Sequence, residues 1–118
     1  MIEFYAPWCP ACKQLTPVFK ELADYSAELG VKLADCDITK SHALSGRFLI
    51  TALPTLFLCE DVVCRKYEGK RDLNTLHEYL QDEQWRLVEP LAWWRFGYLF
   101  MRSIHSFRLI LDSQPECQ

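Results

Sequence analysis

The chain has 118 residues, of which half are hydrophobic and a quarter are charged, and its formal net charge is −3. This composition suits one folded domain with a modest core and excludes an intrinsically disordered chain, which would contain few aromatic residues. The acidic balance gives no indication of nucleic-acid binding, because domains that bind nucleic acids are usually basic.

The charge and the aromatic content change along the chain. Residues 1–85 carry nine Lys and Arg against thirteen Asp and Glu, whereas residues 86–118 carry four Arg against three acidic residues. We therefore predict an acidic domain over 1–85 and a basic, aromatic tail over 86–118. The first residues lack the basic segment and cleavage site of a signal peptide, and no window of 18 residues is apolar enough for an ordinary transmembrane helix.

The first half of the chain predicts a strand, a helix and a second strand. Residues 1–5 read as a short buried strand, and a helix is expected from Cys9 or Pro10 to a stop at Gly30, with a kink at Pro17. A second strand is expected over 31–38. The apolar face of the helix is formed by residues three or four positions apart: Leu15, Val18, Phe19, Leu22, Tyr25 and Leu29.

The next elements predict a short helix, a hairpin and a last helix. Thr39 or Ser41 can begin a helix that ends near residue 48, strands follow over 53–59 and 62–67, and Asp72 can cap a helix. A strand–helix–strand unit must cross over right-handed and pair its strands in parallel, and the hairpin adds an antiparallel partner. We therefore predict an α/β fold. The expected apolar face of the last helix comprises Leu73, Leu76, Tyr79 and Leu80.

The most informative segment contains Cys9 and Cys12 at the predicted strand-to-helix junction. Free backbone N–H groups and the positive end of the helix dipole favour a thiolate there. Two intervening residues give nearly one helical turn, so both sulfurs can meet and form a disulfide. The pattern predicts thiol–disulfide exchange, in which Cys9 is the nucleophile, Cys12 resolves the mixed disulfide and Trp8 shields the pair.

The alternative interpretation of this cysteine pair is half of a zinc site. The other close pair, Cys59 and Cys64, would have to complete it. Cys59 lies five residues along the strand from Pro54, roughly 16 Å from the Cys9 site if Pro54 adjoins that site. We therefore expect no metal. Cys59 and Cys64 flank the hairpin turn, and the sequence leaves open whether they form a cross-strand disulfide.

Four motifs occur along residues 2–85: EFYAPWCPAC over 3–12, SGRF over 45–48, TALPT over 51–55, and YEG over 67–69 with Arg71. With this combination the chain resembles the thioredoxin superfamily, and most closely the thioredoxin-related transmembrane proteins of the protein disulfide isomerase family. The resemblance covers about residues 2–85. It implies a thioredoxin-like fold that lacks the family's first strand and helix. An incomplete chain of that kind would expose a sheet edge and an apolar face.

The resemblance also implies roles for particular residues. Pro54 would be preceded by a cis peptide bond, so that the backbone of Leu53 faces Cys9 and pairs with an extended substrate, beside Trp8 and Pro10. From the residues alone, Pro54 is only a proline that begins a strand. Glu3 would be a buried acid that takes the proton of Cys12, and the alternative is a solvated carboxylate. Arg71 would stabilise the thiolate of Cys12, and the alternative is a surface cation.

The expected function is thiol–disulfide exchange on cysteine-containing protein substrates, without a cofactor. No histidine lies between the cysteines, so the Cys9 thiolate lacks one stabilising cation, which favours reduction or isomerisation over net oxidation. By resemblance, the compartment is the endoplasmic reticulum membrane or lumen. The competing hypothesis is a non-catalytic, inactive module that binds clients in the groove at Leu53 and Pro54.

The tail predicts an amphipathic helix over 91–111. Its apolar stripe comprises Trp93, Phe96, Phe100, Ile104, Phe107 and Leu111. Arginines and polar residues fall on the opposite face, which is typical of a helix that lies on a membrane surface and contacts membrane-bound clients. The alternative is a helix that packs on its own domain.

Overall fold

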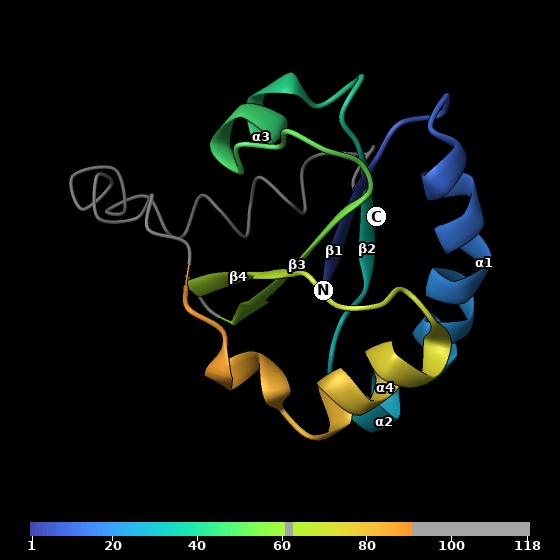
Figure 1. The fold of residues 1–118 in the computed structure, drawn as a ribbon, viewed down its shortest axis with the longest axis vertical. Helices are drawn as coiled ribbons and strands as arrows, with labels where there is room; N and C mark the ends of the chain where they lie inside the picture. Colours follow the sequence, from blue (N-terminus) through green and yellow to red (C-terminus); the bar gives the residue numbers. More distant parts are fainter. Residues whose placement is uncertain (61–62, 91–118) are drawn as a thin grey trace.

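The computed structural model describes residues 1–60 and 63–90, which form a four-stranded sheet with helices on both faces (Figure 1). The strands are β1 (Ile2–Tyr5), β2 (Ala34–Asp37), β3 (Thr55–Glu60) and β4 (Val63–Tyr67). The helices are α1 (Pro10–Asp24), α2 (Ser26–Leu29), α3 (His42–Arg47) and α4 (Leu73–Gln81), followed by the 3₁₀ helix η1 (Gln84–Leu87).

The sheet has the strand order β2-β1-β3-β4. Strands β1 and β2, which α1 connects, are parallel, whereas β3 is antiparallel to both β1 and β4. The α/β architecture and the antiparallel hairpin predicted from the sequence are therefore confirmed. This order places β1, which leads directly into the Cys9 segment, in the interior of the sheet.

Each face of the sheet carries its own hydrophobic core, because successive strand residues point to opposite faces. On one face Leu56, Leu58 and Tyr67 pack against α1, α4 and η1. On the other face Phe4 and Phe57 pack with residues of α3 and the segment after it. The aromatic rings of Phe4, Phe48 and Phe57 contact one another in this second core, with centroids 4.9 to 5.9 Å apart.

The ends of the helices follow their capping residues. Gly30 adopts a left-handed φ of 65° and ends the helical segment as predicted, but α1 itself ends at Asp24 and the short α2 follows. The helix α1 runs through Pro17, which removes one hydrogen bond without ending it. Asp72 caps α4, since its carboxylate accepts a hydrogen bond from the Thr75 N–H at 3.0 Å.

The predicted domain boundary at residue 85 stays a prediction, and the predicted tail helix over 91–111 lies outside the described residues. Trp85 is buried in the core that α1 and α4 cover, and the partly buried Val88 packs against this core. The guanidinium of Arg65 lies 5.5 Å from the centre of the Trp85 ring and donates to the Val88 carbonyl.

None of the helices within 1–60 and 63–90 has the length and hydropathy that a membrane crossing requires.

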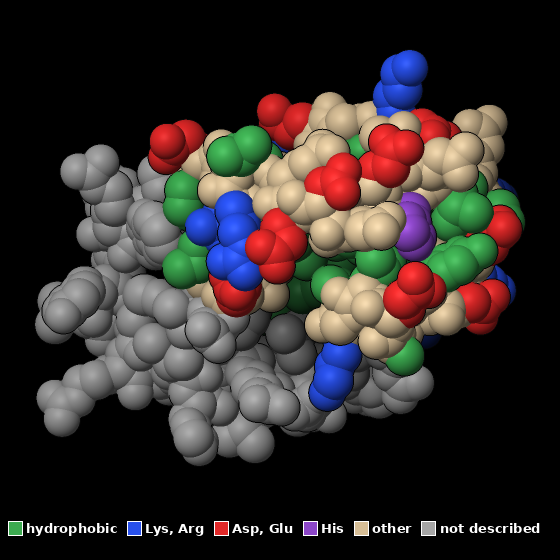
Figure 2. Space-filling model, turned by 90° about the horizontal axis from the view of Figure 1, so that it is seen from below, with side chains coloured by type: hydrophobic (Ala, Val, Ile, Leu, Met, Phe, Trp, Pro, Cys, Tyr) green, Lys and Arg blue, Asp and Glu red, His purple; other side chains and the backbone are tan. Residues whose placement is uncertain are grey.

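Acidic side chains are distributed over the exposed surface around α2 and α4 (Figure 2). Glu28 on α2 and Glu78 on α4 are exposed, as are Asp82 and Glu83 after α4. This distribution agrees with the acidic balance counted for residues 1–85. The exposed surface around α2 and α4 is therefore rich in carboxylates.

Cys59 and Cys64 form a disulfide across the β3–β4 hairpin. The two residues are directly opposite in the strand register, with their Cα atoms 4.1 Å apart. The register therefore answers what the sequence left open, since the hairpin brings the two sulfurs together. Both cysteines are oxidised, so neither is a thiolate available to a metal ion in this structure.

Replacing both Cys59 and Cys64 by serine is expected to lower the free energy of unfolding by about 2 kcal/mol, because the disulfide closes a short loop in the unfolded chain. Urea unfolding of the variant and the parent protein would measure this difference. An unchanged midpoint would show that the hairpin does not depend on the bond. Thiol–disulfide exchange at Cys9 is expected to be unaffected, because Cys59 and Cys64 pack in a different hydrophobic cluster from Cys9 and Cys12.

Candidate active site

Cys9 lies where the chain passes from β1 to α1. The backbone N–H of Cys9 donates to the Ala6 carbonyl at 3.1 Å, which closes a turn, and Pro10 is the first residue of the helix, where its missing N–H costs nothing. The Sγ atom of Cys9 accepts a hydrogen bond from the Cys12 N–H at 3.2 Å. The Cys9 sulfur thus lies at the N-cap position of α1, where N–H groups and the helix dipole stabilise negative charge.

Cys9 and Cys12 are joined in a disulfide, with their Cα atoms 5.3 Å apart. The exposed fractions of their side chains are only 5% and 2%, and they pack with Ala6, Ile38 and Leu53. Both cysteines are therefore almost fully enclosed by the residues around them. The zinc alternative needed both cysteine pairs as thiolates, and the structure shows both pairs as disulfides.

The peptide bond between Leu53 and Pro54 is cis, which confirms the expectation drawn from the resemblance. Pro54 is buried, and the side chain of Leu53 packs against the cluster that contains the two cysteines. Trp8 is 68% exposed. The structure therefore brings Cys9, Cys12 and Leu53 together and leaves an exposed aromatic ring beside them.

Glu3 is buried in β1 on the face that α1 covers, because its neighbours Ile2 and Phe4 point into the opposite core. Its side chain is 3% exposed, and one carboxyl oxygen has no hydrogen-bond partner among the described residues. Burial, and secondarily the charge of Asp35 on β2, raise the pKa of Glu3 to about 7. Glu3 is therefore not the solvated carboxylate of the alternative interpretation, and it can exchange a proton near neutral pH.

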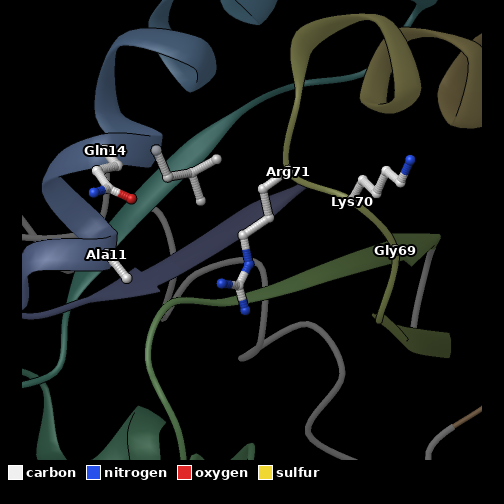
Figure 3. A pocket seen from close by; sticks show the side chains of 6 residues that line it. Ala11, Gln14, Gly69, Lys70 and Arg71 are labelled. Carbon is white, nitrogen blue, oxygen red and sulfur yellow. The ribbon is translucent and has the colours of Figure 1, made fainter.

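Arg71 lies in the loop between β4 and α4, and its Nη2 atom donates a hydrogen bond to the Pro54 carbonyl at 3.3 Å. The side chain is exposed, but it is directed from the loop toward the start of β3 rather than away from the domain (Figure 3). Arg71 therefore contacts the backbone of the cis-proline segment.

A hollow of about 400 Å³ separates α1 from the β4–α4 loop, and we call it the basic hollow. Ala11, Gln14 and Leu15 line it from α1, and Gly69, Lys70 and Arg71 line it from the loop (Figure 3). The sequence reasoning selected Arg71 but missed Gln14 and Lys70. The signal available for Lys70 was its place beside Arg71 in the loop between β4 and α4, and Gln14 gave no signal.

The loop that forms the basic hollow depends on a close contact at Gly69. A Cβ atom at position 69 would lie 2.5 Å from Oη and 2.7 Å from Cζ of Tyr67. The Tyr67 hydroxyl itself donates to the Lys70 carbonyl and so holds the loop. The absence of a side chain at Gly69 therefore allows the tyrosine to lie against the loop.

Replacing Gly69 by alanine is expected to lower the free energy of unfolding by about 1–3 kcal/mol, because the buried Tyr67 ring must shift. Gly46→Ala is the matched control, since no atom lies within 4 Å of a Cβ at that helical position, and it is expected to be neutral or slightly stabilising. Thermal or urea unfolding of both variants would measure this. Equal midpoints for the two variants would contradict the predicted contact.

Comparison with known proteins adds to this geometry. The family model described as Thioredoxin matches residues 1–82. The chain belongs to the thioredoxin family. The predicted thioredoxin-like fold is therefore confirmed, and the Cys9–Cys12 disulfide lies within the part of the chain that the family model covers.

Similar sequences include thioredoxin-related transmembrane proteins and protein disulfide isomerases. The chain is 45% identical over 97 residues to human thioredoxin-related transmembrane protein 1, covering 82% of this chain and 34% of that protein. It is 43% identical over 105 residues to the bovine protein of the same name, covering 88% of the chain and 38% of the relative. Human protein disulfide-isomerase A4 is 36% identical over 92 residues, covering 74% of the chain and 14% of that protein. The chain thus spans little more than a third of the length of these transmembrane relatives, at most.

Solved structures show the same fold. The crystal structure of human ERp44 superposes with a TM-score of 0.66 at 30% identity, covering 70% of this chain and 26% of that chain. Mitochondrial thioredoxin 3 of Saccharomyces cerevisiae, in its oxidized form, gives a TM-score of 0.58 at 29% identity, covering 69% of this chain and 74% of that chain. The resemblance to the transmembrane subgroup stated from the sequence motifs is confirmed by the sequence relatives.

Proposed function

We propose that the chain is a thiol–disulfide oxidoreductase that reduces or isomerises disulfides of protein clients. The observation that carries this proposal is the Cys9–Cys12 disulfide at the N-terminus of α1, packed against Leu53 of the cis-proline segment. A sulfur that accepts a backbone hydrogen bond at a helix N-terminus is stabilised as the thiolate, which is the nucleophile in disulfide exchange.

The proposed reaction transfers two electrons from the Cys9–Cys12 dithiol to the client. The Cys9 thiolate attacks one sulfur of the client disulfide, forms a mixed disulfide and displaces the other client sulfur as a thiolate. Cys12 then gives its proton to the Glu3 carboxylate and attacks the Cys9 sulfur, which releases the second client sulfur as a thiolate and forms the Cys9–Cys12 disulfide. A dithiol reductant such as dithiothreitol regenerates the reduced protein in an assay.

Client binding in this proposal uses the backbone of Leu53. Leu53 packs against Cys9 and Cys12, and an extended client segment is proposed to pair with its backbone as an added strand. The exposed Trp8 ring and Pro10, which flank Cys9 in the sequence, are proposed to supply apolar contact to the client. Arg71 is proposed to stabilise the Cys12 thiolate when its side chain leaves the Pro54 carbonyl.

Reduction or isomerisation is proposed over net oxidation because the two residues between the cysteines are Pro10 and Ala11. Neither carries a positive charge, so the reduced form gains no further stabilisation from a cation between the cysteines and the disulfide is correspondingly more stable. The endoplasmic reticulum is the proposed compartment. The relatives named thioredoxin-related transmembrane proteins and protein disulfide isomerases support this proposal.

Reduction of insulin disulfides in the presence of dithiothreitol tests the proposed function. The parent protein is expected to accelerate the reaction, and Cys9→Ser is expected to reduce it to the uncatalysed rate, because serine cannot form the mixed disulfide. Cooperative thermal unfolding of both proteins controls for folding. Equal rates for the two proteins would overturn the enzyme proposal and favour the non-catalytic client-binding module.

A further inference from the structure

We propose that the basic hollow is a carboxylate-binding subsite, which selects client segments that carry an acidic side chain close to the attacked cysteine. This inference rests on the proposed function, and it adds a preference among clients that neither the cysteine pair nor the cis-proline segment provides. It is carried by the position of the basic hollow, by the absence of an acidic residue among its described lining residues, and by the donor groups of Arg71 and Gln14 that line it.

The basic hollow adjoins the exchange site at two points. Ala11, which lines it, lies between the two cysteines in the sequence, and Arg71, which lines it from the other side, donates to the Pro54 carbonyl at 3.3 Å. A client strand that pairs with Leu53 therefore passes next to the Arg71 guanidinium. Since an extended chain advances about 3.3 Å per residue, side chains one to three residues from the client cysteine are within reach.

Among the described residues, the cations of the basic hollow take part in no ion pair, although Asp72 interacts electrostatically with Lys70. Within 1–60 and 63–90, no acidic residue lines the basic hollow itself. Asp72 follows Arg71 in the chain, but both of its carboxyl oxygens accept hydrogen bonds from Thr75 at the start of α4. The guanidinium uses one donor for the Pro54 carbonyl and has several left for a further acceptor.

The donors lie on opposite sides of the basic hollow. Gln14 projects from α1, and Arg71 projects from the loop across from it, whereas Lys70 extends along the outer side of the loop (Figure 3). A carboxylate in the basic hollow can accept from the guanidinium, which holds carboxylates with two parallel hydrogen bonds, and the Gln14 amide lines the same hollow from α1. Lys70 adds positive charge at the rim. The volume of about 400 Å³ accommodates a Glu or Asp side chain.

The experiment uses a set of disulfide-bonded peptides that differ only in charge near the cysteine. Each peptide carries Glu, Gln or Lys at one of the three positions on either side of the attacked cysteine, and kcat/KM for reduction is measured with the full chain. The parent protein is expected to prefer Glu over Gln by about two- to five-fold at one position, which is the effect of one partly exposed charge pair. The preference is expected to lie mainly in KM and to weaken with added salt.

Variants assign the preference to the basic hollow. Arg71→Gln is expected to bring the ratio of kcat/KM for the Glu peptide to kcat/KM for the Gln peptide to about one. Arg71→Lys is expected to retain most of the preference for Glu. The ratio separates this role from thiolate stabilisation, because loss of thiolate stabilisation lowers kcat/KM for all peptides equally. Lys20→Gln is the matched control: it removes an exposed cation from α1 outside the basic hollow and is expected to leave the ratio unchanged.

The outcomes separate this inference from the proposed function. Equal rates on all peptides, or a preference of the same size at every position, would overturn the subsite and leave the exchange activity intact. A preference that survives Arg71→Gln would overturn it as well. No turnover of any peptide would overturn the proposed function and the subsite with it. A Glu preference at one position that Arg71→Gln removes and Lys20→Gln retains would support the subsite.

Discussion

Replacing Cys12 by serine is expected to stop turnover and to leave Cys9 covalently attached to its client. Cys9 keeps its place at the N-terminus of α1, so it still attacks the client disulfide, but no second sulfur is present to release the mixed disulfide. Insulin reduction is expected to fall by at least about 100-fold. Non-reducing electrophoresis would show a covalent adduct of the variant with insulin, which dithiothreitol separates by reducing the mixed disulfide.

Cys9→Ser is the control for this experiment, because the nucleophile itself is then absent. It is expected to form no adduct. Adducts of equal yield in both variants would mean that Cys12 can begin the reaction, and this would contradict the order of steps proposed here. The hydrogen bond from the Cys12 N–H to the Cys9 sulfur at the N-cap of α1 favours the order in which Cys9 reacts first.

Replacing Glu3 by glutamine is expected to slow the release of clients and to remove a pH dependence of stability. Glutamine has nearly the same shape but cannot accept the proton of Cys12, and loss of a general base costs about 100-fold or more in the step it serves. The attack by Cys9 does not use Glu3 in the proposed mechanism. Mixed disulfides should therefore persist longer in the variant than in the parent protein.

The stability effect follows from the pKa of Glu3, which burial raises from 4.5 to about 7 in the folded protein. The folded protein holds this proton more tightly than the unfolded chain, so the stability contributed by protonated Glu3 is complete below pH 4.5. It is lost as the pH rises toward 7, where ionisation leaves a buried charge. The difference corresponds to about 3 kcal/mol.

Urea unfolding of Glu3→Gln and the parent protein at pH 4 and pH 8 would measure this effect. The stability of the variant relative to the parent is expected to increase by about 3 kcal/mol between these two values. Other titrating groups cancel in this comparison. An equal difference at both pH values would show that Glu3 is ionised with an ordinary pKa in the folded protein, and its proposed role as proton acceptor would then fail.

Much of the fold was predictable because its elements carry local signals. The spacing of Leu15, Phe19 and Leu22 matches one helical face, Asp72 caps its helix, and Gly30 ends a helical segment in a left-handed conformation. The break between α1 and α2 was not predicted. The apolar spacing of the face continues past Asp24, so the pattern gives no sign that the helix ends there. The 3₁₀ helix η1 is too short to have a periodic pattern.

The site was predictable to the extent that its chemistry is local in sequence. Cys9 and Cys12 are three residues apart, and the strand before them and the apolar spacing after them place both cysteines at the start of a helix. The cis bond before Pro54 required the family resemblance, because a proline at the start of a strand is ordinarily trans. The basic hollow could not be predicted, since it depends on how Gln14 on α1 faces a loop more than fifty residues away in the chain.

The sulfur of Cys9 has two functions at once, because it is both the atom that reacts and the acceptor that caps α1. A negatively charged sulfur accepts this hydrogen bond more strongly than a sulfur in a disulfide. The redox equilibrium of the cysteine pair and the stability of α1 are therefore thermodynamically linked. Each interaction that strengthens the hydrogen bonds of the first turn to the Cys9 thiolate also stabilises the reduced form relative to the disulfide. Substitutions in the first turn of α1 are accordingly expected to change the redox potential of the Cys9–Cys12 pair without replacing either cysteine.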